Sequence, residues 1–361
     1  MSRLEFKTKI IKEGWLPILS VVSLLFTSIY IKKLPTYSFN DVEILFILFG
    51  LFITIKGIEN SSLFLKTTGI LKNVKRVPFV LVILTFFLSM FVTNDVALLI
   101  MVPLTLTLVI CKKDIIIILE ALAANAGSAF TPFGNPQNLY IYWYYGLKPL
   151  EFFKVIAPFS LIFLILLILV SLLIKANYSH DYKVVEIKLK YTSYIYLGFL
   201  FIFILIILKL IPVYIGLIIP VFAIIFDRKS LKVDYGLLLT FLCFFGTSSN
   251  LKIILYDDLK IYSHSLFFLS AGISQIMSNV PATLLLAKFT HDWKHLLWGV
   301  NVGGFGTVIG SLANLIAFRL YISSREEKKT SSIKFTIKFF VMGFITFFIG
   351  CGLYLVFKNF L

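Results

Sequence analysis

Two polar segments of similar sequence interrupt the otherwise apolar chain. Residues 125–139 align with residues 301–315 at six identical positions of fifteen: Asn125/Asn301, Gly127/Gly303, Thr131/Thr307, Gly134/Gly310, Asn138/Asn314 and Leu139/Leu315. Upstream, Thr93-Asn94-Asp95 occupies the place that Ser278-Asn279-Val280 occupies in the second half. This self-similarity predicts an internal repeat with two polar breaks in each half.

Breaks of this kind create ion sites when they lie at membrane depth. A helix end leaves N–H groups and carbonyls without helical partners. N-terminal ends therefore attract anions, and carbonyls with Asn, Ser and Thr oxygens suit a small hard cation such as sodium. Asn94 and Asn279 are the candidates for sodium. The expected substrate- and ion-binding residues are Thr93, Asn94, Asp95, Asn125, Gly127, Ser128, Thr131, Gly134, Asn135, Asn138, Ser278, Asn279, Asn301, Gly303, Gly304, Thr307, Gly310, Ser311 and Asn314.

Packing is the alternative explanation for the glycines. Small residues let helices approach closely, and Gly306 and Gly310 fit the G-x-x-x-G spacing that does so. For the paired asparagines a binding site is favoured, because an amide in lipid needs partners and the repeat brings these residues together. Asn138 and Asn314 have a simpler alternative role, which is to cap the half-helices at each break.

Two acidic residues fall inside apolar stretches. A carboxylate at the depth expected for Asp95 costs about 3 kcal/mol on insertion scales, which predicts that it binds a cation or carries a proton. The alternative is a hairpin-tip cap that accepts N–H bonds from the next helix. Glu120 could equally snorkel or pair near the interface, or join the site.

Other chemistries find little support. The chain has no Gly-Lys dipeptide, hence no P-loop and no ATP-driven mechanism, and no H-E-x-x-H motif, hence no metalloprotease site. Neither an enzyme nor an organic cofactor is expected. Cys111, Cys243 and Cys351 lack the spacing of metal ligands. His291 and His295 have the i, i+4 spacing of a metal pair, but without an obvious third ligand a solvated loop is favoured.

The elements that hold these residues must be membrane helices. The chain has 361 residues, of which 59% are apolar and 14% charged, against roughly 25% charged residues in a soluble domain. This composition excludes a soluble enzyme and a disordered chain. The net charge of +16 is interpreted as loop charge that orients the protein in lipid, and no nucleic-acid partner is expected. The predicted fold class is an all-α polytopic membrane protein.

Apolar runs predict about nine transmembrane crossings. Uninterrupted runs cover residues 15–31, 42–58, 152–174, 197–226, 235–254 and 335–357. The run 197–226 is too long for one crossing and should split near Lys209 and Pro212. Interrupted stretches predict two re-entrant hairpins, at 77–110 and 262–290, and two discontinuous helices, at 115–145 and 293–320.

The two halves are expected to be inverted relative to each other. The first repeat spans 1–176, a cytoplasmic loop and linking helix span 177–210, and the second repeat spans 211–361. Five crossings precede the second repeat, and an odd number turns it upside down. With a cytoplasmic N-terminus, 24 of the 34 Lys and Arg residues face the cytoplasm. This asymmetry predicts a multi-pass protein of the cytoplasmic (plasma) membrane.

The four breaks together resemble the ion transporter superfamily, which contains arsenite permeases, sodium–proton antiporters, citrate transporters and divalent anion–sodium symporters. The resemblance covers about residues 40–357. It implies a homodimer in which a scaffold holds mobile transport domains that move as elevators. It also implies that the tips at Thr93-Asn94-Asp95 and Ser278-Asn279-Val280 bind sodium and substrate. Asp95 and Val280 depart from the symporter pattern, and the two tips look more like the arsenite permease and antiporter branch.

The expected function is secondary active transport of a small anion, driven by a sodium or proton gradient. The first alternative is a cation–proton antiporter that uses Asp95, and the second is an arsenite efflux permease. A third alternative, from another class of membrane protein, is a channel or a non-transporting scaffold. The sequence leaves open which anion is carried and which ion is coupled.

Overall fold

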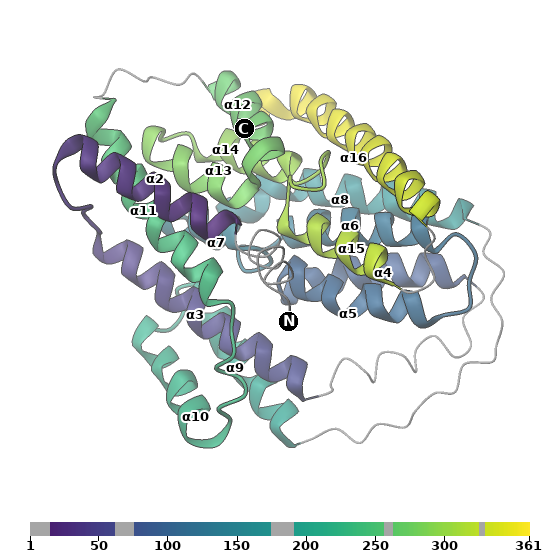
Figure 1. Ribbon diagram of the computed structural model, residues 1–361, viewed down its shortest axis with the longest axis horizontal. Coiled ribbons are helices and arrows are strands. Elements are labelled where there is room, and N and C mark those ends of the chain that lie inside the picture. Colours follow the sequence, from purple (N-terminus) through teal and green to yellow (C-terminus); the bar gives the residue numbers. More distant parts are fainter. Residues whose placement is uncertain (1–14, 62–75, 175–190, 256–262, 325–328) are drawn as a thin grey trace.

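The computed structural model describes residues 15–61, 76–174, 191–255, 263–324 and 329–361, and these residues form helices and no strand (Figure 1). The all-α prediction is confirmed for them. Within these ranges, three helical segments are long and apolar enough to cross a membrane: Pro149–Leu173, Tyr235–Ile254 and Ser332–Phe360. Many of their large apolar side chains are exposed, as lipid-facing positions require. The total number of crossings stays a prediction.

One group of helices lies on the left of Figure 1, and we call it the peripheral group. It contains α2 (Trp15–Ile31) packed along α11 (Tyr235–Ile254), and α3 (Phe39–Asn60) packed along α9 (Tyr191–Ile207). The 3-10 helix η2 (Val213–Leu217) and α10 (Ile218–Phe226) follow α9. The long apolar run therefore splits as predicted, with Lys209 at a φ of 60° and Pro212 extended before η2.

Two helical hairpins belong to a second group, which we call the hairpin group. The first hairpin consists of α4 (Val77–Phe91) and α5 (Asn94–Thr107), separated by two extended residues. The second consists of α12 (Ser263–Met277) and α13 (Asn279–Leu286), with Ser278 between them and η4 (Ala287–Phe289) after them. Each pair of helices falls within a stretch, 77–110 or 262–290, for which the sequence predicts a hairpin. Whether they re-enter the membrane from one side stays a prediction.

Two interrupted helices complete the core of the hairpin group. The first comprises α6 (Lys113–Ala129) and α7 (Pro136–Tyr144), and the second comprises α14 (Trp293–Gly303) and α15 (Leu312–Ser323). Each second half begins with a side-chain cap: Asn135 accepts from the N–H of Asn138 at 2.9 Å, and Ser311 accepts from the N–H of Asn314 at 3.1 Å. Around them lie α8 (Pro149–Leu173), α16 (Lys329–Phe357) and η5 (Lys358–Phe360).

Close helix packing joins each hairpin to the interrupted helix of its own half. Helix α4 packs on α6, and α12 packs on α14. A Cβ on Gly127 would lie 2.2 Å from the Phe86 carbonyl oxygen, and one on Gly303 would lie 2.5 Å from Ser274 Cβ. These two glycines are therefore needed for backbone approach, which supports the packing explanation at both positions.

Candidate functional site

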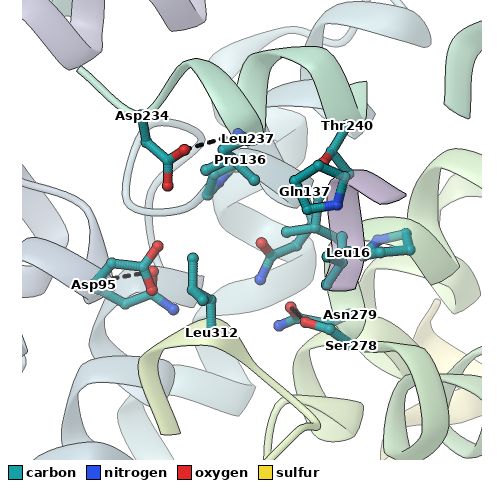
Figure 2. Close-up of a pocket in the computed structure, with 14 residues that line it drawn as sticks. Leu16, Asp95, Pro136, Gln137, Asp234, Leu237, Thr240, Ser278, Asn279 and Leu312 are labelled. Atoms are coloured by element: carbon teal, nitrogen blue, oxygen red, sulfur yellow. Dashed lines mark hydrogen bonds between the residues drawn. The ribbon is translucent and has the colours of Figure 1, made fainter. Parts of the chain in front are cut away.

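A cavity of about 70 Å³ lies where four helices of the hairpin group begin (Figure 2). The first residues of α5, α7, α13 and α15 all line it, namely Asn94, Pro136, Asn279 and Leu312. The peripheral group closes it with Leu16 and Pro17 of α2 and with Asp234, Leu237 and Thr240 at the start of α11. Each helix N-terminus contributes roughly half a positive charge, so the hairpin group presents a positive potential to this space without a basic side chain in the lining.

The two hairpin tips are held in the same way. The backbone N–H of Asn94 donates to the carbonyl of Gly134 at 3.0 Å, and that of Asn279 donates to the carbonyl of Gly310 at 3.0 Å. Each tip is therefore fixed to the break of the interrupted helix in its own half. Ser278 has a φ of 77°, a region that costs a non-glycine residue about 1–3 kcal/mol and that persists only where neighbouring contacts impose it.

Buried asparagines connect the two halves. Asn125 Nδ2 donates to Asn314 Oδ1 at 2.7 Å, and Asn301 Nδ2 donates to Asn138 Oδ1 at 2.9 Å. Asn94 joins this network through a 3.2 Å bond from its Nδ2 to Asn125 Oδ1. Because an unpaired amide in a low-dielectric interior is costly, these reciprocal bonds fix the breaks of one half against those of the other.

The remaining polar residues of the breaks satisfy the backbone. Asn138 Nδ2 donates to the carbonyls of Ala129 and Thr131, and Asn314 Nδ2 donates to those of Gly304 and Thr307. The Thr131 hydroxyl donates to the carbonyl of Met90, and the Thr307 hydroxyl donates to the carbonyl of Gln275. Met90 and Gln275 each lie three residues before the first residue of a hairpin tip, Thr93 and Ser278. Equivalent residues thus make equivalent bonds, as an internal repeat requires. The inverted orientation of the second repeat stays a prediction.

Only some of the predicted site residues reach the cavity. Asn94, Asp95, Ser278 and Asn279 line it. The others lie behind the lining, in the network and the packing that hold the helix ends: Thr93, Asn125, Gly127, Ser128, Thr131, Gly134, Asn135, Asn138, Asn301, Gly303, Gly304, Thr307, Gly310, Ser311 and Asn314. The structure brings the predicted set into one region but separates it into lining and support.

Asp95 lies at the edge of the cavity on the first turn of α5 (Figure 2). Its backbone N–H donates to Asn94 Oδ1 at 3.0 Å. Its Oδ1 is buried without a hydrogen-bond partner among the described residues. No N–H of those residues donates to the carboxylate, so the interpretation of Asp95 as a hairpin-tip cap finds no supporting contact. A buried carboxylate oxygen facing a cavity suits a cation or a proton.

Three polar lining residues had not been predicted: Gln137 of α7, and Asp234 and Thr240 of the peripheral group. Asp234 caps α11, because its Oδ1 accepts from the N–H of Leu237 at 2.9 Å. Nothing local in the sequence places the start of α11 beside the hairpin tips. Gln137 did carry a signal, since it directly precedes Asn138 in the repeated segment yet pairs with Ala313 in the second half.

Two expectations about charged residues need correction. Glu120 neither snorkels nor lines the cavity: it is fully buried (0% exposed), and Thr105 Oγ1 donates to its Oε1 at 2.5 Å.

His295 does not lie in a solvated loop, because α14 begins at Trp293 and buries it to 7% exposure beside Tyr354. Its Nδ1 lies 2.7 Å from Asp292 Oδ1. Within the described part of the chain, no three His, Cys, Asp or Glu side chains cluster as metal ligands.

Comparison with known proteins places this architecture in a family. Residues 13–292 match the family described as Citrate transporter. The chain is 39% identical to an uncharacterized transporter of Methanocaldococcus jannaschii over 324 residues, which cover 83% of this chain and 89% of the relative. It is 36% identical to inner membrane protein YbiR of Escherichia coli over 302 residues, which cover 78% of this chain and 80% of that protein.

Proposed function

The chain belongs to the citrate transporter family, and on that premise we propose that it is a secondary active transporter of a small anion, driven by a sodium or proton gradient. The observation that carries the proposal is the convergence of four helix N-termini on one cavity. Aligned helix dipoles stabilise an anion there. Binding of this kind needs no basic side chain.

The same cavity supports a place for the coupling ion. Asp95 and the amides of Asn94 and Asn279 lie beside the helix N-termini, so a sodium ion or a proton at Asp95 would offset part of the charge of a bound anion. Substrate and coupling ion would then bind better together than apart. This thermodynamic coupling is what a symporter requires.

The position of the cavity supports an elevator movement. Its walls come from two groups of helices: the hairpin tips and interrupted helices on one side, and α2 and α11 of the peripheral group on the other. Movement of the hairpin group against the peripheral group would carry the site across the membrane while the asparagine network keeps it intact. We propose that the peripheral group is the scaffold and that the protein acts as a homodimer embedded in lipid.

Uptake into proteoliposomes tests this function. The purified full-length chain is reconstituted, and accumulation of radiolabelled citrate, acetate, phosphate, sulfate and arsenite is measured with a sodium gradient, a proton gradient or neither. We expect one class of anion to accumulate against its gradient with one of the two ions, and its flux to saturate and to be trans-stimulated. Flux without saturation would indicate a channel, and absence of accumulation with every anion would refute the proposal. Arsenite as the only substrate would establish the efflux permease alternative.

A cation–proton antiporter is the second candidate, and one observation favours it. Asp95 and Asp234 both line the cavity, and its described lining contains no Lys, Arg or His. Two carboxyl groups without a basic partner suit exchange of a metal cation for protons. In the same proteoliposomes, a trapped pH indicator would respond to added sodium, lithium or potassium without any organic or inorganic anion substrate. Such a response would show cation–proton exchange and would contradict the proposed anion transport.

A further inference from the structure

The side chain of Gln137 lies in the cavity wall and is almost fully buried. It is 2% exposed and lies in the first turn of α7. Figure 2 shows its amide pointing into the space bounded by Asp95, Leu312 and Asn279. No hydrogen bond to this amide is present among the residues that the structure describes. Gln275, by contrast, is satisfied: its Oε1 accepts from the N–H of Thr307 at 2.9 Å, and its Nε2 donates to the carbonyl of Gly303 at 2.8 Å.

An amide in this position is available to a ligand. The side chain is fixed by its burial in the first turn of α7, and its amide faces the cavity. The amide can donate two hydrogen bonds and accept two. It therefore offers a ligand in the cavity a directional contact that the helix N-termini alone do not provide.

The repeat shows that the lining, unlike the support behind it, differs between the halves. Asn138, which anchors the break, has its counterpart in Asn314, but Gln137 corresponds to Ala313. Likewise Asn94 has its counterpart in Asn279, but Asp95 corresponds to Val280. The first half therefore adds two polar side chains to the lining, Asp95 and Gln137, whose counterparts in the second half are apolar.

The second half and the peripheral group contribute most of the apolar side chains of the lining, beside the polar Ser278, Asn279, Asp234 and Thr240. Val280, Pro281 and Leu312 line the cavity from α13 and α15, and Leu16 and Leu237 face it from α2 and α11. An inorganic oxyanion is polar on every side and would place unsolvated oxygens against these apolar side chains. A ligand with one polar end and a short carbon skeleton would match both the polar and the apolar side chains of the lining.

We propose that Gln137 is a substrate-recognition residue and that the substrate is a short-chain organic carboxylate. This inference rests on the proposed anion transport and specifies its ligand. The carboxylate lies against the Gln137 amide and the N-termini of α5 and α7, and the carbon skeleton lies against Val280 and Leu312. The cavity volume of about 70 Å³ favours an acid of few carbon atoms.

The test compares anions on the wild-type chain and then removes the amide. Proteoliposomes with the full-length protein are given acetate, propionate, butyrate, citrate, phosphate, sulfate and arsenite under the driving gradient. We expect short-chain carboxylates to be accumulated with the lowest KM. Gln137→Leu, which keeps the bulk of the side chain, should raise that KM about 10- to 100-fold, the loss expected for a hydrogen bond to a charged group. Gln137→Asn, which retains an amide on a shorter side chain, should recover part of the affinity.

Controls separate this inference from the proposed function. Thr346→Val removes a polar group on α16, outside the cavity lining, and should leave the KM unchanged. Ligand-induced thermal stabilisation of each purified variant in detergent provides a binding readout without transport. If inorganic oxyanions are accumulated and carboxylates are not, or if Gln137→Leu leaves both KM and stabilisation unchanged, the inference is wrong while anion transport stands. If no anion binds or accumulates in the wild type, the proposed function itself fails.

Discussion

At the scale of single residues, the two hairpin tips carry matched asparagines. Asn94 and Asn279 are both buried, both line the cavity and both donate a backbone bond to a glycine carbonyl in the adjacent break. Their side chains differ in what they contact, because Asn94 also donates to Asn125, whereas Asn279 accepts from the Ser278 hydroxyl at 3.4 Å. Substitution leaves the backbone bond in place, so a mutation tests the side-chain amide alone.

Asn94→Ala and Asn279→Ala should each abolish transport while leaving an assembled protein in the membrane. Each substitution removes an amide that can contact the ion or the substrate, and groups that act together are not additive. Uptake is measured alongside expression and size-exclusion profile. Asn250→Ala is the matched control, because Asn250 is a buried asparagine that bonds Thr27 and Ser28 in the peripheral group. Near wild-type uptake by either variant would show that the asparagine at that tip serves packing and not binding.

Asp95→Asn should lose gradient-driven accumulation and retain slow exchange of substrate. The substitution keeps the size of the side chain and removes its charge and its titration, so the coupling ion loses its site. Uptake and counterflow are measured as functions of pH and sodium concentration. If Asp95 binds sodium, protons should compete with sodium in the wild type and this competition should vanish in the variant. Unchanged accumulation, with unchanged pH and sodium dependence, would locate coupling elsewhere.

At the scale of elements, each hairpin lies against its interrupted helix at a glycine. Gly127 and Gly303 are equivalent in the repeat, and a Cβ at either would overlap the opposite helix. The approach sets the position of the hairpin tip relative to the break, because α4 leads directly into the tip at Thr93. Packing at these two positions therefore acts on the site indirectly.

Gly127→Ala should destabilise the protein by about 1–3 kcal/mol, the usual cost of inserting a methyl group into a packed interior. Thermal unfolding of the detergent-solubilised protein measures the effect. Gly272→Ala on α12 is the control, since a Cβ there meets nothing within 4 Å. It should leave the melting temperature unchanged or raise it, because alanine favours helix. Equal melting temperatures for both variants would contradict the close approach at Gly127.

At the scale of the whole molecule, a few contacts join the two helix groups away from the cavity. Lys288, at the end of the second hairpin, pairs with Asp41 of α3 at 3.6 Å. The same ammonium group donates to the Phe245 carbonyl and to Ser249 Oγ of α11. A movement of the hairpin group past the peripheral group must break these contacts and form others.

A covalent crosslink across this contact should stop transport. In a chain with Cys111, Cys243 and Cys351 replaced by serine, Asp41→Cys with Lys288→Cys is treated with a bifunctional thiol reagent that contains a cleavable disulfide, and uptake is measured before and after cleavage. We expect more than tenfold loss on crosslinking and recovery with dithiothreitol. Thr27→Cys with Asn250→Cys joins α2 to α11 inside the peripheral group and should leave uptake unaffected. Full activity of the crosslinked 41–288 protein would refute movement between the groups.

The side of the membrane that residues 183 and 260 face tests the inverted repeat. Residues 183 and 260 lie outside the described ranges, and the charge distribution predicts that 183 faces the cytoplasm and 260 the exterior. Lys183→Cys and Lys260→Cys are exposed to an impermeant thiol reagent in intact cells. Labelling at 260 but not at 183 is expected. The opposite pattern would overturn the topology, and the inverted orientation of the second repeat with it.

The sequence by itself determined where helices begin and end around the site. Proline, glycine and asparagine act on the backbone within a few residues, so both hairpins, both interruptions and the split near Lys209 could be predicted from local chemistry. Only the tertiary structure decided which residues face the cavity. Gln137 and Asp234 come from helices distant in sequence, and Glu120 and His295 are buried by neighbours that no local pattern specifies. Side-chain exposure depends on long-range packing, and that packing separated the predicted residues into a lining and its support.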